Sequence, residues 1–408
     1  MDRPIPFVTR VRLRDFKSIA QCDVRLGPFT VVVGPNASGK SNFLSSLKFL
    51  SQAIGTSVYD ALESFGGLDA ILRRGPIQAT SFSIDIEAAV RWGPDPSQWP
   101  RAIYGFEIGR PPGYGIRTFE VLRESCEIHL GDRKWGFRVE RGQVIDDSMA
   151  NAAPSIPADT LYLGIAARNT TYGPLFEALS SMLFYDEFYR VDVESSSEPI
   201  GEAILGPHGE NLSNVLASLA AARPDLIERI NNYLNAISPR IKGVETLTFG
   251  SSRAVVFRQQ VGRNGDEVEF RPAAVSHGTT HATCVLAALF QLPVVDGRVP
   301  LITIEEPGIS LHPAAAGVLF DALTEASEHV QIIVTNHSPE LLDRDDVGST
   351  VIVVARIDSG ESRIGEIDPA GKETVKDNLY TIGELMRGDQ VFPDVGNPTD
   401  SDSKDSED

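Results

Sequence analysis

Three short apolar runs predict strands in the core of the fold. They cover residues 29–33, 300–304 and 330–335. Apolar residues dominate each run without regular alternation, which is typical of strands that are buried within a sheet. A core sheet assembled from distant parts of the chain is therefore expected.

Alternating and aromatic-rich runs predict a second group of strands over residues 80–145. The clearest runs cover residues 81–87, 103–108 and 135–140. Proline and glycine separate successive runs, as in Gly93-Pro94-Asp95-Pro96, and such residues favour turns. The pattern predicts an antiparallel meander.

Helical spacing of apolar residues predicts helices over residues 42–54, 158–190 and 212–237, the last interrupted at Pro224. The polar stretch 194–199 is expected to be a linker. No long heptad array is present, so an extended coiled coil is not expected. An aromatic cluster ends the second segment, and we expect it to pack in the core, the alternative being a base-stacking platform: Phe184, Tyr185, Phe188 and Tyr189.

A complete phosphate-binding loop joins the first apolar run to the first helix. Glycines let a backbone fold around phosphates, and the amides at a helix N-terminus point at the anion. Lys40 is expected to reach the terminal phosphates, and Ser41 to ligate Mg2+. The alternative is a glycine turn without a ligand, but the strand before it and the helix after it favour binding of ATP or GTP. The predicted nucleotide-binding residues are Gly34, Pro35, Asn36, Ala37, Ser38, Gly39, Lys40, Ser41 and Asn42.

Two further apolar runs deliver side chains that suit nucleotide chemistry. Glu305 and Glu306 end the run 300–304, and His337 follows the run 330–335. Glu305 is predicted to hold the metal, and Glu306 to polarise the attacking water as a general base. His337 is placed to sense the γ-phosphate. Singly, an acidic pair is usually a solvated strand end and a histidine usually structural, but their order after the phosphate-binding loop favours function.

These motifs resemble the RecF/SMC-like branch of the ABC-type ATPases, in particular stand-alone prokaryotic AAA-family ATPases related to the ATPase domains of OLD-family nucleases. Residues 11–19 (VRLRDFKSI) look like the family's first strand and its nFrsi segment. Residues 305–313 (EEPGISLHP) look like its Walker B motif and D-loop, and residues 335–342 (TNHSPELL) like its switch segment. The resemblance extends over residues 8–390.

The resemblance also implies a dimer that sandwiches ATP. Ser276, His277, Gly278 and Thr279 occupy the place of the family's signature, ahead of a helix expected over residues 280–292. In relatives the start of this helix caps the γ-phosphate bound to the opposite subunit, and helix N-termini do attract anions. The alternative, in which Ser276 is only an N-cap, is compatible with this role.

Three positions depart from the family pattern. Glu305 replaces the more common Asp, and His277 and His281 stand where many relatives carry Asp and Arg. Gln78 is the candidate for the family's Q-loop glutamine. Nucleotide binding is therefore expected to be preserved, whereas the rate of hydrolysis is left open.

Composition favours a large cytoplasmic protein without a membrane span. The chain has 408 residues and three cysteines, Cys22, Cys126 and Cys284, too few and too scattered for a disulfide framework. Residues 1–10 lack the pattern of a signal peptide, so none is expected there. The net charge is −19, so contact with nucleic acid would need a local basic patch, such as Arg73-Arg74 or Arg240-Ile241-Lys242, or a partner chain.

The sequence as a whole predicts an α/β P-loop NTPase with an ABC/SMC-like head, an antiparallel sheet subdomain and a helical insertion. By resemblance, we expect a Mg2+-dependent ATPase homodimer that controls a separate nuclease or toxin in phage defence or DNA repair. The alternative is a nucleotide-gated scaffold with slow hydrolysis. The expected ATPase domain covers residues 1–393, with an N-terminal lobe, a helical insertion, a C-terminal lobe and a disordered acidic tail: 1–157, 158–240, 241–393 and 394–408.

Overall fold

A computed structural model provides the structure of the chain. It describes these residues: 6–75, 78–93, 95, 98–111, 119–149, 155–188, 195–196, 203–250, 252–262, 265–344, 350–377 and 379–394. The acidic tail beyond residue 394 and most of the expected linker lie outside this set.

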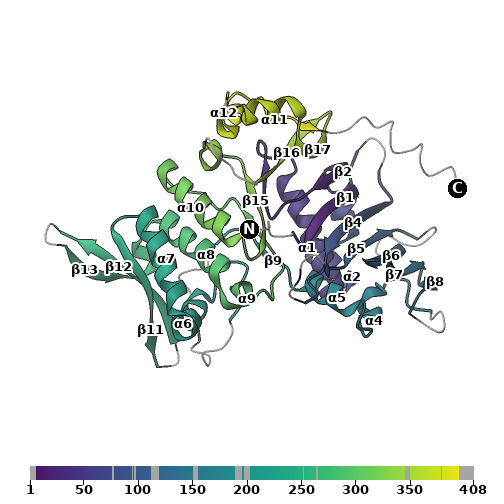
Figure 1. Ribbon diagram of the computed structural model, residues 1–408, viewed down its shortest axis with the longest axis horizontal. Coiled ribbons are helices and arrows are strands. Elements are labelled where there is room, and N and C mark those ends of the chain that lie inside the picture. Colours follow the sequence, from purple (N-terminus) through teal and green to yellow (C-terminus); the bar gives the residue numbers. More distant parts are fainter. Residues whose placement is uncertain are drawn as a thin grey trace.

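One mixed sheet runs through most of the molecule (Figure 1). Its strand order is β8-β7-β6-β5-β4-β1-β2-β17-β16-β3-β15-β14-β9, and β18 pairs with β17. The strands are β1 (Val8–Phe16), β2 (Ile19–Arg25), β3 (Phe29–Val33), β4 (Ser81–Ala89), β5 (Arg101–Gly109), β6 (Glu120–Leu130), β7 (Arg133–Glu140), β8 (Gln143–Asp147), β9 (Leu183–Tyr185), β14 (Leu301–Glu305), β15 (Gln331–Asn336), β16 (Val351–Asp358), β17 (Glu361–Ile367) and β18 (Pro393–Asp394).

The central strands are parallel and buried, as their apolar runs predict. β3 pairs in parallel with both β15 and β16, and β14 pairs in parallel with β15 and β9. Val32 of β3 packs in one hydrophobic cluster, whereas Val31 and Val33 pack in another. Because neighbouring side chains enter different clusters, this strand is covered on both faces, which explains its continuous apolar run.

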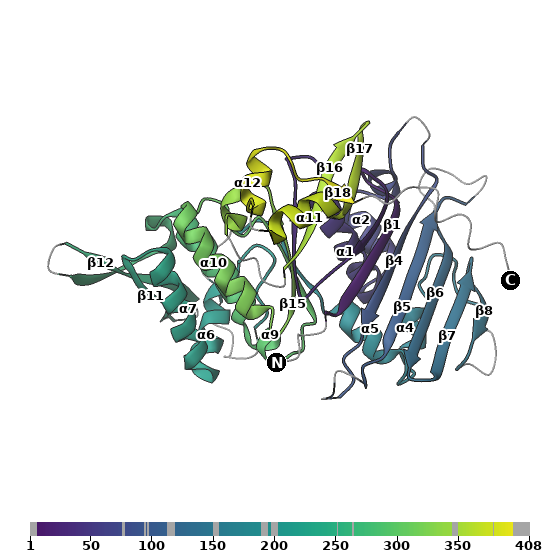
Figure 2. The same ribbon diagram turned by 45° about the horizontal axis from the view of Figure 1, so that its top comes forward.

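The predicted meander is confirmed, but it is not a separate sheet. Strands β4 to β8 pair antiparallel in sequence order, and β4 continues through β1 and β2. One residue pair, Ile19 with Ser362, joins β2 to β17. The antiparallel half, on the right in Figure 2, is therefore an extension of the core sheet.

Helices cover the sheet and extend the molecule at the end opposite β8 (Figure 1). The break at Pro224 is confirmed, since one helix ends at Ala222 and the next begins at Pro224. The helices are α1 (Lys40–Gly55), α2 (Val58–Ser64), α3 (Leu68–Ile71), α4 (Leu163–Ala166), α5 (Gly173–Ser180), α6 (Leu212–Ala222), α7 (Pro224–Ile237), α8 (His277–Phe290), α9 (Leu292–Val295), α10 (Pro313–Ala326), α11 (Pro369–Lys376) and α12 (Ile382–Arg387), with 3-10 turns η2 (Pro272–Ala274) and η3 (Pro339–Leu342).

The prediction of helix over residues 158–190 is confirmed only in part. Among its described residues, 158–188, the helices are α4 and α5, and the residues after α5 include strand β9 beside β14. Three residues are too few to show a period, and the main-chain pairing with β14 decides their conformation. Core packing of the aromatic cluster is confirmed for Tyr185 and Phe188, which are at most 2% exposed. Tyr189 lies outside the described residues.

A second, four-stranded sheet was not predicted. It consists of β10 (Ser195–Ser196), β11 (Ile241–Phe249), β12 (Ser252–Val261) and β13 (Asp266–Phe270), all paired antiparallel. It packs with α6 and α7 at the far left of Figure 1. Two residues of the expected linker are therefore strand, and the expected helical insertion includes strands of both sheets.

Residues 277–295, which hold α8 and α9, are long and apolar enough to cross a membrane by length and composition alone. However, 89% of the most apolar window is buried inside the protein. These helices pack in the hydrophobic cluster that also contains β14 and β15. The segment is therefore the core helix of a folded domain.

A buried carboxyl group joins the antiparallel strands to α4. Glu124 of β6 accepts hydrogen bonds from the Tyr104 hydroxyl at 2.9 Å and from the backbone N–H groups of Tyr162 and Leu163 at 2.5 and 2.9 Å. Burial raises the pKa of Glu124 to about 7 from its usual value of 4.5, against the opposing effect of these donors. Glu124 is therefore a buried titratable group near neutral pH.

We expect Glu124 to make the protein less stable as pH rises from about 4.5 to about 7. In this window the unfolded carboxyl group is ionised while the folded one keeps its proton, so folding binds a proton. The free energy of unfolding should fall by about 3 kcal/mol across the window, then level off. Glu124→Gln should remove this slope in urea unfolding at several pH values, whereas Glu140→Gln, at an exposed position of β7, should keep it. Equal slopes in both variants would contradict the assignment.

Candidate functional site

The candidate site lies where the central parallel strands end. The phosphate-binding loop follows β3, Glu305 ends β14, and His337 follows β15. β15 lies between β3 and β14, so these segments meet at one edge of the sheet. Ligands of open α/β sheets bind outside the carboxyl ends of such strands.

The loop of residues 34–41 has a backbone that requires its glycines. Gly34 and Gly39 have φ values of 149° and 105°. A Cβ on Gly34 would lie 2.0 Å from the Ala355 carbonyl oxygen, and one on Gly39 would lie 2.4 Å from Ser362 Oγ. Larger residues at these positions would therefore push the loop away from the sheet.

The start of α1 fits an anion. Gly39 at its N-cap provides no side-chain hydrogen bond, and the first turn holds no acidic residue. The first amides of the helix are therefore left for another acceptor. Ser38 Oγ is buried and has no hydrogen-bond partner among the described residues. A phosphate group would supply acceptors to both.

Lys40 is held at the loop. Its Nζ donates to the carbonyl oxygens of Gly34 and Pro35, both at 2.9 Å. Burial lowers its pKa, and the charges of Glu306 and Glu305 oppose this. The lysine charge therefore lies within the loop, close to the carboxylates of Glu305 and Glu306 at the end of β14.

The two predicted metal ligands touch each other. Ser41 Oγ donates a hydrogen bond to Glu305 Oε2 at 2.5 Å, across 264 residues of sequence. Burial raises the pKa of Glu305, and the hydrogen bond from Ser41 opposes it. A hydroxyl and a carboxylate beside a phosphate site are hard oxygen ligands of the kind that Mg2+ takes. The arrangement fits Mg2+, and the longer Glu side chain still reaches Ser41.

Glu306 and His337 form a second pair. Glu306 Oε2 contacts His337 Nδ1. Glu306 has a φ of 49°, and its backbone N–H faces the Thr335 carbonyl oxygen at 3.2 Å and Oγ1 at 3.1 Å. A positive φ at a non-glycine residue is uncommon and concentrates at functional sites. The bend turns Glu306 away from the line of β14 and toward the end of β15.

Asp186 is a site residue that sequence analysis missed. It follows β9, where Tyr185 pairs with Ile304, so it lies at the level of Glu305 on the next strand. Asp186 Oδ2 accepts a hydrogen bond from Lys48 Nζ at 2.8 Å, and both line a cavity of about 280 Å³ that also includes Glu305. Recognising residues 183–185 as a strand would have revealed it. The Q-loop candidate Gln78 is exposed.

The side chain of Asn42 is engaged in a hydrogen bond to another part of the chain. Its Nδ2 donates to Ser18 Oγ at 2.7 Å, and Ser18 Oγ lies 2.6 Å from Ser362 Oγ. Its backbone amide, by contrast, belongs to the first turn of α1. Asn42 therefore links the helix to the turn between β1 and β2.

The signature segment forms the start of α8. This helix begins at His277, three residues earlier than expected, because Ser276 Oγ accepts from the Thr279 amide and acts as N-cap. Ser276 and His277 are exposed. A Cβ on Gly278 would lie 2.4 Å from the Ser310 carbonyl oxygen, so glycine permits close packing on the loop after Glu306. The helix start is thus open to solvent on one side and in contact with the loop that follows Glu306 on the other.

His281 points inward from α8. It is 1% exposed, and its ring lies 5.4 Å from that of Phe188. Burial lowers its pKa to about 4, against the opposing influence of the backbone of Glu306 and Pro307. The neutral ring therefore packs between the signature helix and the segment that follows β9.

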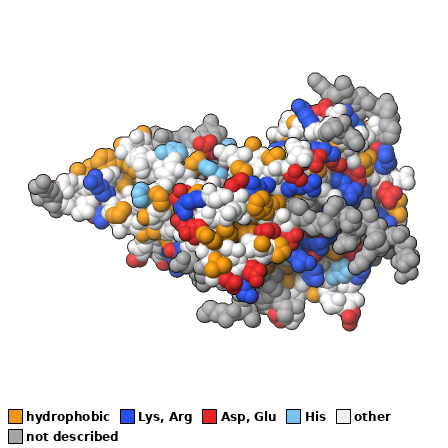
Figure 3. All heavy atoms as spheres, turned by 90° about the horizontal axis from the view of Figure 1, so that it is seen from above, with side chains coloured by type: hydrophobic (Ala, Val, Ile, Leu, Met, Phe, Trp, Pro, Cys, Tyr) orange, Lys and Arg blue, Asp and Glu red, His pale blue; other side chains and the backbone are white. Residues whose placement is uncertain are grey.

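One arginine of the expected Arg73-Arg74 patch is engaged within the protein. Arg73 pairs with Asp15 at 2.6 Å and with Glu361 at 2.8 Å. On the face shown in Figure 3, Lys and Arg side chains are interspersed with Asp and Glu side chains. The geometry thus removes Arg73 from the residues that could contact nucleic acid.

Comparison with protein families settles the class of the chain. Residues 29–123 and 184–343 match the family described as "AAA domain, putative AbiEii toxin, Type IV TA system". The two segments hold β3, the phosphate-binding loop, the signature, both glutamates and His337. The chain belongs to this AAA family. The second matched segment resumes within β9, which agrees with its place in the core sheet.

Two known proteins extend this assignment. The AAA-family chain is 23% identical over 374 residues to the Old nuclease of Escherichia phage P2, across 84% of the chain and 58% of that nuclease. It therefore spans less than two thirds of the length of this relative. The crystal structure of an SmcHead bound to the C-winged helix domain of ScpA superimposes with a TM-score of 0.53 at 14% identity, covering 90% of this chain and all of that one. The predicted ABC/SMC-like P-loop fold, related to OLD nucleases, is confirmed.

Proposed function

We propose that this protein is a Mg2+-dependent ATPase that works as a homodimer and controls a separate effector protein. The observation that carries the proposal is the meeting of two side-chain pairs at one sheet edge, Ser41 with Glu305 and Glu306 with His337. The first pair suits a metal ion, and the second suits activation of water. Family membership and the phosphate-binding loop support the same reading.

Each residue has a distinct task in this proposal. The amides of residues 39–41 and Lys40 hold the phosphates, and Ser41 and Glu305 would hold Mg2+. When bound, Mg2+ supplies positive charge that offsets the charge of the phosphate oxygens. Glu306 orients and polarises the attacking water, and His337, already in contact with Glu306, senses the γ-phosphate.

A dimer would complete the site. Ser276 and His277 stand exposed at the N-terminus of α8, where amides and a hydroxyl can meet an anion from outside the subunit. Gly278 links this helix start to Ser310, in the loop that follows Glu306. A nucleotide held between two subunits would therefore contact the start of α8 of the opposite subunit. In each subunit this helix start touches the loop that follows Glu306.

Relatives suggest where such an ATPase acts. The chain belongs to a family described by a putative AbiEii toxin, and its phage relative is a nuclease. A related fold has been crystallised with a bound partner domain. We infer that a nuclease or toxin, supplied by a separate chain, is the effector, in phage defence or DNA repair. Contact with nucleic acid would be indirect or local.

A nucleotide-gated scaffold with slow hydrolysis is the second candidate. The intact Glu306 and His337 favour hydrolysis, but the altered signature, in which His277 and His281 stand where many relatives carry Asp and Arg, favours the scaffold. Glu305, in place of the usual Asp, points the same way. Turnover measurements on Glu306→Gln separate the two candidates, because a scaffold would lose little on this substitution.

Ser276→Arg tests the proposed dimer. In a Glu306→Gln background, which retains ATP, Mg-ATP should shift the mass from monomer to dimer, since a ligand favours the state that binds it better. Ser276→Arg should block this shift because a bulky side chain would fill the junction. Light scattering with and without Mg-ATP measures the masses.

The matched control is Ser57→Arg. Ser57 caps α2 just as Ser276 caps α8, so both variants lose an N-cap that contributes about 1 kcal/mol. Only the signature variant should lose ATP-dependent dimerisation. A mass that does not respond to ATP, or a dimer that survives Ser276→Arg, would argue against the sandwich.

A further inference from the structure

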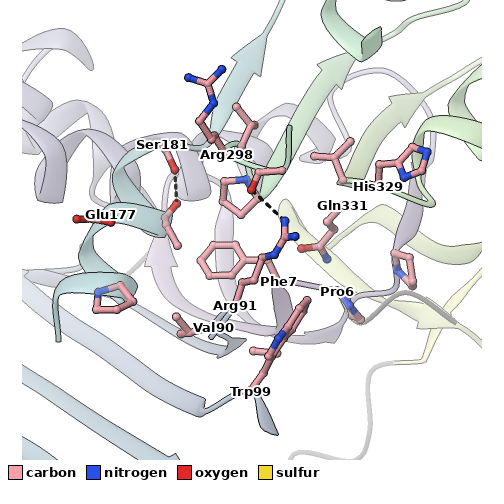
Figure 4. A pocket seen from close by; sticks show the side chains of 18 of the residues that line it. Pro6, Phe7, Val90, Arg91, Trp99, Glu177, Ser181, Arg298, His329 and Gln331 are labelled. Carbon is pink, nitrogen blue, oxygen red and sulfur yellow. Dashed lines mark hydrogen bonds between the residues drawn. The ribbon is translucent and has the colours of Figure 1, made fainter. Parts of the chain in front are cut away.

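A second cavity lies at the edge of the sheet opposite to the nucleotide site. It encloses about 420 Å³, within the usual range of small-molecule sites. Residues from both parts of the chain line it, including Phe7, Val90 and Trp99 from the antiparallel half and Arg298 and His329 from the central half (Figure 4). The cavity therefore forms only where the antiparallel and central halves of the folded chain meet.

The cavity lies where the site-bearing strands begin. Pro28 precedes β3, Pro300 precedes β14, and Gln331 is the first residue of β15. Each of these strands has five or six residues, so the cavity is on the order of 17 Å from the phosphate-binding edge. An occupant would touch the strands that carry the nucleotide site without blocking that site.

Gln331 gives the cavity a fixed inner wall. This side chain is 4% exposed and makes three hydrogen bonds: Oε1 accepts from the Val8 amide at 2.8 Å, and Nε2 donates to the carbonyl oxygens of Val8 and Gly27 at 2.7 and 3.0 Å. It thereby ties β1 and the approach to β3 onto β15. With its polar atoms engaged by backbone, Gln331 preforms the cavity and does not need a ligand to hold it open.

The lining combines an apolar surface with a basic rim. Arg91 NH1 donates to the Gly297 carbonyl oxygen at 3.3 Å, and Arg298 NH2 to Asp296 Oδ2 at 3.2 Å. Among the described lining residues, Arg91, Arg298 and His329 are basic and Glu177 is acidic. Arg298 therefore already has a carboxylate partner, whereas Arg91 donates to a neutral carbonyl group and brings positive charge to the cavity. The apolar wall is made largely of aromatic and proline side chains: Pro6, Phe7, Pro28, Trp99, Pro174 and Pro300.

We propose that this cavity binds a small amphipathic anion, with an aromatic or aliphatic body and one carboxylate, sulfonate or phosphate group. The body would rest on Phe7 and Trp99, and the anionic group would meet the guanidinium group of Arg91. The inference goes beyond the proposed ATPase and does not depend on hydrolysis or dimerisation.

The binding test uses 1-anilinonaphthalene-8-sulfonate, an aromatic sulfonate that fluoresces in apolar sites. In the full-length protein it should bind saturably, and decanoate should displace it at a concentration about tenfold lower than uncharged decanol does. Equal displacement by the two competitors would overturn the anionic part of the proposal. Failure of the probe to bind saturably would overturn the site.

Two variants locate the bound probe. Ala178→Trp fills the cavity from α5, and Arg91→Glu reverses a charge at its rim. Each should weaken binding by about tenfold or more, while the exposed control variants Ala370→Trp and Arg133→Glu bind as the parent does. Binding of a fluorescent ATP analogue at the other edge of the sheet reports that each variant is folded. Unchanged probe affinity in folded Ala178→Trp would place the probe elsewhere and overturn the proposal.

Discussion

Glu306→Gln should slow ATP turnover by a factor on the order of 100 or more while leaving ATP binding intact. The amide keeps the size of the side chain but cannot accept a proton from the attacking water. The predicted phosphate and metal contacts belong to Lys40, Ser41 and Glu305, so affinity should be preserved. Steady-state phosphate release and binding of a fluorescent ATP analogue measure the two effects separately.

Glu328→Gln is the matched control, since Glu328 is exposed beyond α10 and precedes β15 at the opposite edge of the sheet. It should turn over ATP at the parent rate. If Glu306→Gln hydrolyses ATP as fast as this control, the general base lies elsewhere, and the scaffold candidate gains. Glu305 would then be the next residue to test.

Lys40→Ala should abolish binding of the fluorescent ATP analogue. The substitution removes the positive charge from the phosphate-binding loop and the two hydrogen bonds by which Nζ holds Gly34 and Pro35. Both the attraction for the terminal phosphates and the closed form of the loop are lost. Fluorescence anisotropy at increasing protein concentration measures the loss.

Lys376→Ala, at the exposed end of α11, removes the same charge from a distant surface and should bind the analogue as the parent does. Circular dichroism of Lys40→Ala reports that the fold is retained. Parent-like affinity in a folded Lys40→Ala variant would refute the assignment of the loop, and with it the proposed ATPase.

Sequence patterns predicted elements whose signal is local. The strands β3, β14 and β15 were predicted because five or six consecutive residues carry the apolar run. β9 was missed because its three residues resemble the continuation of a helix, and Asp186 was missed with it. The second antiparallel sheet was missed as well, since strand pairing depends on partners that are distant in sequence.

In the candidate site, too, the parts with a local sequence signal could be predicted, and the contacts between distant residues could not. The phosphate-binding loop could be recognised because its glycines, Lys40 and Ser41 are contiguous, and its chemistry comes largely from backbone amides. The roles expected for Glu305, Glu306 and His337 came from their order and from resemblance. Their contacts could not be predicted from spacing, because they depend on which strands become neighbours.

The sequence by itself therefore determined the phosphate-binding loop, its flanking strand and helix, and the class of the fold. The tertiary structure alone decided that Ser41 meets Glu305 and that Glu306 meets His337. It also decided that the antiparallel strands join the core through the pairing of Ile19 with Ser362. The physical reason is that local conformation follows from neighbouring residues, whereas contacts across hundreds of residues exist only once the strand order of the sheet is fixed.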